Sequence, residues 1–172
     1  SIFVHMQSIE SEAKIAQEYL ARIAKDAEAK FDEHLPPVKD RPCRLHEAMR
    51  YSMFAGGKRL RPGLAKATFD MFGGKGDKIW LATSALEMLH TFSLIHDDLP
   101  CVDNDDYRRG KLTSHKKFGE ATAVMAGDAL CIHAFEMMGK TGNAKAIELL
   151  AHLLGTYGMI GGEMTDIECE GK

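Results

Sequence analysis

Five carboxylates fall within ten consecutive residues, from Asp97 to Asp106. So many like charges repel one another unless a cation neutralises them. Mg²⁺ is a hard cation that usually takes one or two carboxylates from a protein and leaves coordination positions for substrate phosphate. The segment therefore favours a divalent-cation site that faces a phosphorylated substrate, and a solvated acidic loop is the alternative.

The spacing of these acids excludes an EF-hand calcium loop. Such a loop starting at Asp103 would need glycine at position 108 and glutamate at position 114. The chain has Arg108 and Ser114 at those positions. Asp103 instead returns after Pro100 has broken the helix that Asp97 ends, which places the two carboxylates on either side of a turn.

Three cations, Lys58, Arg59 and Arg61, lie in the segment Gly56–Pro62, where a helix is predicted to begin. Free backbone N–H groups and the helix dipole favour an anion at such a position. The segment is not a Walker A loop, because that motif needs glycine at position 52 and serine or threonine at position 59. On this cluster alone, an anion site and a solvated basic surface both stay open.

A second basic cluster, Arg108, Arg109 and Lys111, follows the acids directly. Arginine pairs bidentately with phosphate oxygens. A mixture of acids and arginines within one loop suits a metal–diphosphate complex better than a plain solvated surface does.

His90 precedes Asp97 by two helical turns, so His90, Ser93 and Asp97 share one helix face. A role at the site and a role as a satisfied core histidine are both compatible with this position. His90 and His96 do not form a zinc pair, because a separation of six residues puts them on different faces.

The elements that must position these residues are all helical, so the predicted fold class is all-α. An apolar stripe at three- and four-residue steps marks an N-terminal helix that lies on the domain or on a second subunit; its members are Ile9, Ala13, Ala16, Leu20, Ile23, Ala27 and Phe31. Further helices are predicted at 44–55, 62–72, 77–97 (with Asp77 as its cap), 120–138 and 143–168, separated by breaks rich in proline or glycine. A polar loop is predicted from the acids to about Ser114.

The composition of the 172 residues is that of an ordinary globular domain, with 45% apolar and 27% charged residues. A net charge of −3 gives no basic field for nucleic acid, and no apolar run reaches the ~20 residues of a membrane span. The four cysteines are widely spaced, which favours neither a zinc site nor a disulfide framework. This spacing suits a reducing cytosol or a plastid-like interior, and the predicted location is cytoplasmic. Residues 1–6 are interpreted as a vector remnant.

Taken together, these motifs resemble the farnesyl and geranylgeranyl diphosphate synthases, the trans-prenyl diphosphate synthase family. The resemblance runs through Gly56–Pro62, His90–Gly110, Gly127–Leu130 and Gly161–Asp166, and covers nearly the whole chain from about Arg44. Pro100-Cys101 looks like the two-residue insertion of the bacterial and plant branch. The resemblance implies a helical bundle of the isoprenoid synthase type, here incomplete at its C-terminal side, with residues 7–172 forming the N-terminal part of one domain.

The resemblance also implies an activity, which is Mg²⁺-dependent head-to-tail condensation of an allylic diphosphate with isopentenyl diphosphate. The implied metal ligands are Asp97, Asp98 and Asp103, and Arg108 would contact the allylic diphosphate. The implied contacts of isopentenyl diphosphate are Lys58, Arg61, His90 and Arg109, and Asp166 would lie near the allylic head group. A homodimer is the expected assembly.

Two departures from the family pattern matter. Glu163 stands where the family usually has glutamine, which adds an acid beside the site. The second aspartate-rich motif, and the lysine and glutamine that precede it in the family, are absent from the 172 residues, so we expect them alone to form only part of the pocket and to be inactive. The alternative functions are a non-catalytic partner subunit and a class I terpene cyclase.

Product length is predicted from Phe92 and Ser93. A growing chain must extend from the aspartates into an apolar cavity, and each helical turn spans about 5.4 Å. In the resembling family an aromatic ring five residues before the aspartates closes that cavity early. Phe92 holds this position, so a C15 product is favoured over C20, while a simple core role for Phe92 is compatible with the same sequence.

Overall fold

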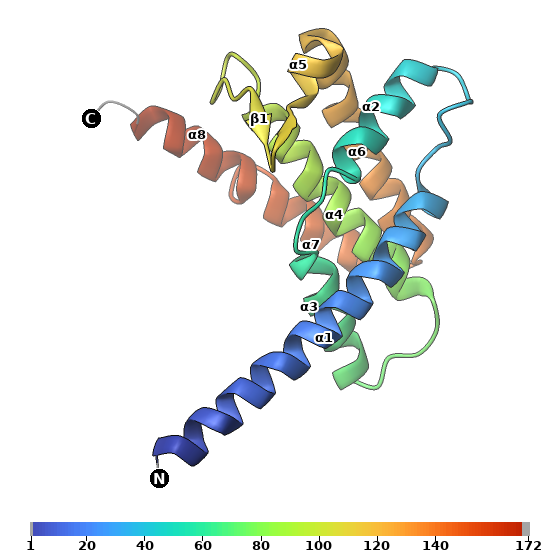
Figure 1. Cartoon of the computed structure of the whole chain (residues 1–172). Coiled ribbons are helices and arrows are strands. Elements are labelled where there is room, and N and C mark those ends of the chain that lie inside the picture. The colour runs from blue at the N-terminus through green and yellow to red at the C-terminus, as the bar shows by residue number, and fades with distance from the viewer. Residues whose placement is uncertain (1, 170–172) are drawn as a thin grey trace.

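The computed structural model describes residues 2–169, with side chains from residue 11 onward, and it is a bundle of α-helices as predicted (Figure 1). The part of the predicted vector remnant that falls on residue 1 lies outside the described residues. Within residues 2–169, no helix is both long and apolar enough to cross a membrane. The elements are α1 (Ile2–His34), α2 (Cys43–Met53), α3 (Leu60–Met71), α4 (Lys78–Asp97), β1 (Tyr107–Arg108), β2 (Lys111–Leu112), α5 (Ser114–Phe118), α6 (Glu120–Lys140), α7 (Ala144–Leu154) and α8 (Met159–Cys169).

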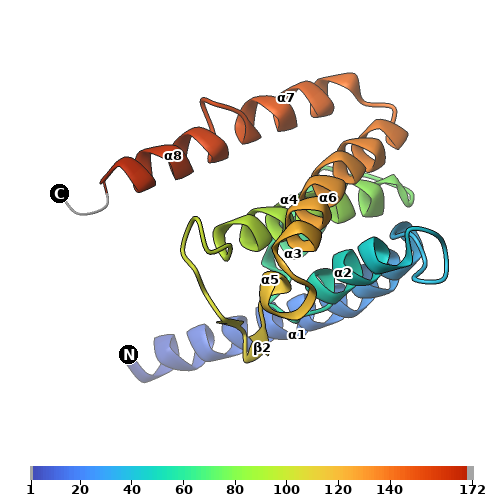
Figure 2. The ribbon, with the colours of Figure 1, turned by 90° about the horizontal axis from the view of Figure 1, so that it is seen from above.

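Helix α4 lies at the centre of the bundle and packs along α6, with α1, α2 and α3 around it (Figures 1 and 2). Its buried residues point in every direction around its axis, which is the pattern of a helix enclosed by others. Met88, Leu89 and Ile95 enter the core opposite Ala126 and Leu130 of α6. Because the core fixes α4, it also fixes the carboxylates at the end of α4.

The apolar stripe of α1 is only partly used. Ile23, Ala27 and Phe31 are buried in the core, whereas Ile15 is 66% exposed. Figure 1 shows the N-terminal part of α1 projecting away from the bundle. The prediction that this helix lies on the domain therefore holds for its second half.

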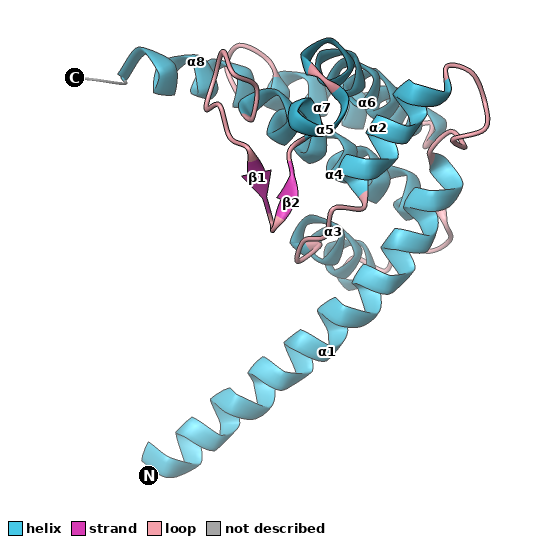
Figure 3. Cartoon of the chain, turned by 45° about the horizontal axis from the view of Figure 1, so that its top comes forward, coloured by secondary structure: helices cyan, strands magenta, loops and turns pink. Residues whose placement is uncertain are grey.

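Two local predictions were wrong. The loop after the acids contains a short antiparallel hairpin, β1 and β2, followed by the single-turn helix α5 (Figure 3). The helix predicted at 143–168 is two helices, because a tight turn separates α7 from α8. A Cβ on Gly158 would lie 1.9 Å from the carbonyl oxygen of Leu153, so this turn needs glycine. Asp77 does lie at the start of α4, although its side chain accepts no capping hydrogen bond.

Helix α8 contributes no buried residue to the bundle. Its apolar side chains Ile160, Met164 and Ile167 are each at least 40% exposed. Figure 2 shows α7 and α8 together forming one layer above α4 and α6. This layer leaves room for a pocket between α4 and α8.

Candidate active site

The end of α4 brings Asp97 and Asp103 toward each other. Asp97 is the last residue of the helix, and its carbonyl oxygen accepts a hydrogen bond from the Asp103 amide at 2.8 Å. Asn104 adopts a left-handed φ of 55°, which turns the chain back at this point. The predicted return of Asp103 after Pro100 is therefore confirmed.

Asp98 has a different environment from its neighbour. It is 3% exposed, and its carboxylate accepts two hydrogen bonds from Nε of Arg108, both at 3.0 Å, and one from Nη2 at 2.7 Å. This charge-assisted pair raises the pKa of Arg108 further above its ordinary value. Arg108 is held there by strand β1, the element that the sequence did not predict.

Asp97 carries uncompensated negative charge. Burial raises the pKa of Asp97 to about 6, and the nearby carboxylates of Glu163 and Asp103 act in the same direction. Neither Asp97 nor Asp103 makes an ion pair with any residue in the described part of the chain. Glu163 thus adds its charge directly to this site.

The carboxylates at the end of α4 suit Mg²⁺, which needs few protein ligands, better than a metal ion that is coordinated by protein side chains alone. Among the side chains that the structure describes, residues 11–169, no group of three His, Cys, Asp or Glu is placed to hold a metal ion. Mg²⁺ characteristically uses one or two carboxylates and completes its shell with water and substrate phosphate. Asp97 and Asp103 match that requirement, and Asp98 could join them only if Arg108 moved.

An apolar pocket opens beside Asp97, between α4 and α8. Its volume is about 370 Å³, and it is lined by Phe92, Ser93, His96, Asp97, Met159, Ile160, Glu163, Met164 and Ile167. Phe92 is 8% exposed and meets the ring of His96 edge-on, with centroids 5.7 Å apart. Both predicted chain-length residues, Phe92 and Ser93, therefore line a pocket that begins at Asp97. The sequence reasoning missed its α8 wall, although the apolar spacing of Ile160, Met164 and Ile167 was visible.

A separate cationic pocket of about 450 Å³ lies on another side of α4. It is lined by Gly57, Lys58, Arg59, Leu60, Arg61, Glu87, His90 and Arg109. The four residues expected to grip isopentenyl diphosphate are thus brought together. Burial, followed by the nearby charge of Arg61, lowers the pKa of His90 below its ordinary value. Although His90 shares a helix face with Ser93 and Asp97 in sequence, it faces the cationic pocket, while they face the apolar one.

Arg109 and Gly57 meet closely at the mouth of the cationic pocket. The Arg109 guanidinium donates a hydrogen bond to the carbonyl oxygen of Gly56. A Cβ on Gly57 would lie 2.6 Å from Nη1 of Arg109, and Gly57 has a φ of +136°. The backbone conformation requires glycine at position 57, and a side chain there would also displace the Arg109 guanidinium.

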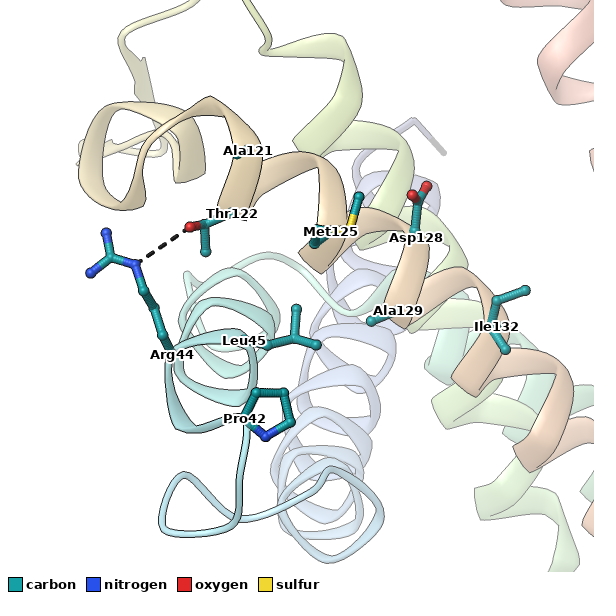
Figure 4. A pocket seen from close by; sticks show the side chains of 9 residues that line it. All are labelled: Pro42, Arg44, Leu45, Ala121, Thr122, Met125, Asp128, Ala129 and Ile132. Carbon is teal, nitrogen blue, oxygen red and sulfur yellow. Dashed lines mark hydrogen bonds between the residues drawn. The ribbon is translucent and has the colours of Figure 1, made fainter.

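Two features lie apart from these pockets. Asp166 is on the exposed side of α8 and lines neither the apolar nor the cationic pocket. A hollow of about 690 Å³ lies between α2 and α6 (Figure 4), and Leu45, Met125 and Ile132 give it an apolar lining. No predicted site residue lines this hollow, so its size does not make it the active site.

The helical bundle is of the isoprenoid synthase type, with carboxylates and a cationic pocket on different sides of its central helix. The chain belongs to the Polyprenyl synthetase family, which it matches over residues 42–172. A solved structure described as an FPP/GFPP synthase from Zymomonas mobilis superposes with a TM-score of 0.87 at 42% identity, covering 93% of this chain and 60% of that one. This likeness confirms the all-α bundle of the isoprenoid synthase type.

Among curated relatives, the farnesyl diphosphate synthase of Micrococcus luteus is 54% identical over 134 residues, which cover 75% of this chain and 46% of the relative. The heterodimeric geranylgeranyl pyrophosphate synthase large subunit 1 of Arabidopsis thaliana is 50% identical over 144 residues, covering 78% of this chain and 38% of the relative. The chain therefore spans less than half the length of these relatives.

Proposed function

We propose that residues 7–172 form the N-terminal part of a polyprenyl synthase domain that condenses an allylic diphosphate with isopentenyl diphosphate in the presence of Mg²⁺. The observation that carries this proposal is the presence of two separate pockets on different sides of α4, one apolar and bordered by the carboxylate of Asp97, the other cationic. A class I terpene cyclase takes one diphosphate and would leave the cationic pocket without a role. A non-catalytic partner subunit would have no need for the uncompensated carboxylates at Asp97 and Asp103.

In this proposal each group of residues has a distinct task. Asp97 and Asp103 would hold Mg²⁺, which when bound supplies positive charge to the departing allylic diphosphate. Asp98 would fix Arg108 so that its remaining N–H groups face the same diphosphate. Asp166 as a head-group contact and Asp98 as a direct metal ligand stay predictions.

The cationic pocket would bind the second substrate without metal. Lys58, Arg61 and Arg109 supply fixed positive charge, and His90 with its lowered pKa would act as a neutral hydrogen-bonding group until the bound diphosphate draws a proton to it. The apolar pocket would take the hydrocarbon of the allylic substrate and keep water away from the reacting carbon.

The test is diphosphate binding and turnover in aspartate variants. In a catalytically complete protein that contains these residues, Asp97→Asn and Asp103→Asn should each lower turnover by about a hundredfold or more. Asp106→Asn is the matched control, because Asp106 belongs to the same loop but pairs with Lys116 at 3.1 Å. Near-normal turnover in both site variants would remove the assignment. The 172-residue chain alone should bind diphosphate yet turn over little or nothing, which a mass-verified sample would check.

We further propose a C15 product, because Phe92 closes part of the apolar pocket close to the aspartates. Phe92→Ala should shift the products toward C20 and longer chains. Phe118→Ala is the control, since Phe118 is a buried ring that packs on Tyr51 and does not line the apolar pocket. Product analysis by chromatography decides, and a wild type that makes mainly C20, or an alanine variant with unchanged products, would contradict the role of Phe92.

A homodimer is the proposed assembly, and a cytoplasmic location stays a prediction. The support for the homodimer is the apolar hollow between α2 and α6, which has Arg44 near one end and Asp128 near the other (Figure 4). If the two-fold axis passes midway between these residues, Arg44 of one copy would face Asp128 of the other, and Asp128 of the first copy would face Arg44 of the second. Mass measurement in solution by light scattering would show a monomer if this proposal is wrong.

A further inference from the structure

Arg59 does not face the solvent with its two cationic neighbours but turns into the protein. Its side chain is 1% exposed, and Nη1 donates to Oε1 of Glu87 at 2.9 Å. Nε and Nη2 donate to Oε1 of Glu28 at 3.2 and 3.1 Å, and Nη2 also donates to the carbonyl oxygen of Met53 at 2.8 Å. The guanidinium lies over the ring of Phe31.

These contacts hold the backbone in an unfavourable conformation. Arg59 has φ 49° and ψ 36°, in the left-handed region that residues with a Cβ rarely adopt. It is the residue from which α3 starts, and it lies between Lys58 and Arg61. The inward turn of Arg59 therefore decides in which direction its two neighbours point.

Lys58 and Arg61 remain available to a ligand. Both are exposed, both line the cationic pocket, and neither makes an ion pair with a residue of the described part of the chain. Arg59 thus anchors the loop while the residues on either side of it present their charges.

Glu87 has the complementary role on α4. It is the one carboxylate among the lining residues of the cationic pocket, one helical turn before His90, and its side chain is 4% exposed. An unpaired carboxylate there would repel a diphosphate. The hydrogen bond to Arg59 neutralises it, so that the other cations keep their full effect.

We propose that Arg59, held by Glu87, is a positioning residue that sets the cationic pocket for the diphosphate of isopentenyl diphosphate by fixing Lys58 and Arg61. The inference rests on the proposed function of that pocket. Arg59 would not touch the substrate. Lysine could not replace it, because a single ammonium group cannot supply the forked set of hydrogen bonds to Glu87, Glu28 and the Met53 carbonyl.

The experiment is calorimetric titration of the 172-residue chain with inorganic diphosphate in EDTA, at a temperature where each variant is folded by circular dichroism. Arg59→Lys should weaken binding about tenfold, as expected for coupled members of one network. Arg50→Lys is the matched control: Arg50 also bonds several carbonyl oxygens and Asp32, yet lies outside the pocket, so its loss should change affinity less than about twofold.

A second measurement distinguishes positioning from a direct contact. In a chain that already carries Lys58→Ala and Arg61→Ala, Arg59→Lys should have little further effect on affinity. If Arg59→Lys does not fold, Glu28→Gln loosens the same guanidinium from a half-exposed position and should weaken binding about twofold to threefold.

Equal affinity of wild type and the folded variant would overturn the positioning role and leave the proposed function standing. An undiminished effect of Arg59→Lys without Lys58 and Arg61 would also overturn it. Absence of diphosphate binding by the wild type would overturn the proposed function of the pocket, and this inference with it.

Discussion

Gly127 on α6 faces the end of α4, and its replacement by alanine tests how closely the site depends on helix packing. A Cβ at this position would lie 2.2 Å from Nε2 of His96 and 2.6 Å from its Cδ2. The His96 ring is packed edge-on against Phe92, and its Nε2 lies 3.2 Å from the carbonyl oxygen of Val124. Either the ring must rotate or α6 must move away from α4.

The expected cost follows from three contributions. Overpacking of this kind costs about 1–3 kcal/mol, and loss of the hydrogen bond between His96 and Val124 adds about 1 kcal/mol. The higher helix propensity of alanine offsets about 1 kcal/mol. Gly127→Ala should therefore lower the free energy of unfolding by about 2 kcal/mol, which lowers Tm by about 4–8 °C for a chain of this size.

Gly139→Ala is the matched control, because Gly139 lies in the same helix and a Cβ there would have no neighbour within 4 Å. This variant should gain about 0.5–1 kcal/mol from helix propensity alone. Calorimetric unfolding of both variants and the wild type gives the comparison. If Gly127→Ala is stabilised to the same extent as Gly139→Ala, α4 and α6 are not packed as described, and the reasoning is refuted.

Two further predictions concern buried charge and pH. Glu87→Leu should cost about 1–3 kcal/mol in urea unfolding, because Nη1 of the buried Arg59 loses its partner and only the half-exposed Glu28 remains to compensate the charge. Glu87→Leu combined with Arg59→Met should restore most of that loss, and an additive loss would contradict the pairing. Nδ1 of His34 lies 2.7 Å from the Ser84 hydroxyl, and burial lowers the pKa of His34 below its ordinary value of 6.5. As pH falls, the unfolded chain therefore takes up this proton before the folded protein does. The free energy of unfolding should decrease as pH falls from 6.5 through the lowered pKa. His34→Gln should weaken this pH dependence, and an unchanged dependence would exclude His34 as its source.

The sequence predicted the helices and the position of the aspartates because these depend on local signals. Apolar periodicity, the proline-containing break before α2 and the glycines near position 74 are each readable within a few residues. Pro100 likewise marks where α4 must end. The hairpin β1–β2 has only two residues in each strand, which is too short for an alternating pattern to be recognised.

What the sequence could not predict is which charged residue pairs with which. Arg59 is surrounded in sequence by exposed cations, and nothing nearby indicates that Glu28 and Glu87, 31 and 28 residues away, draw it inward. Asp98 and Arg108 are close in sequence, yet their pairing needs the turn of β1. Pairings of this kind depend on tertiary structure, and the residue patterns that reveal helices carry little information about them.

The two polar sites share one electrostatic arrangement. At the end of α4, Asp98 is neutralised by Arg108, while Asp97 keeps its charge and its raised pKa. In the cationic pocket, Arg59 is neutralised by Glu87, while Lys58 remains unpaired.

A buried charge is tolerated only when it is paired, so the paired member of each site can enter the protein and hold the loop in place. The unpaired members stay at the surface of a pocket, where a ligand of opposite charge supplies the missing partner. Removal of Asp98 or Arg59 should therefore disturb ligand affinity through geometry, whereas removal of Asp97 or Lys58 should disturb it through charge. Added salt should strongly reduce the change in ligand affinity caused by removing Asp97 or Lys58, and it should leave the change caused by removing Asp98 or Arg59 nearly the same.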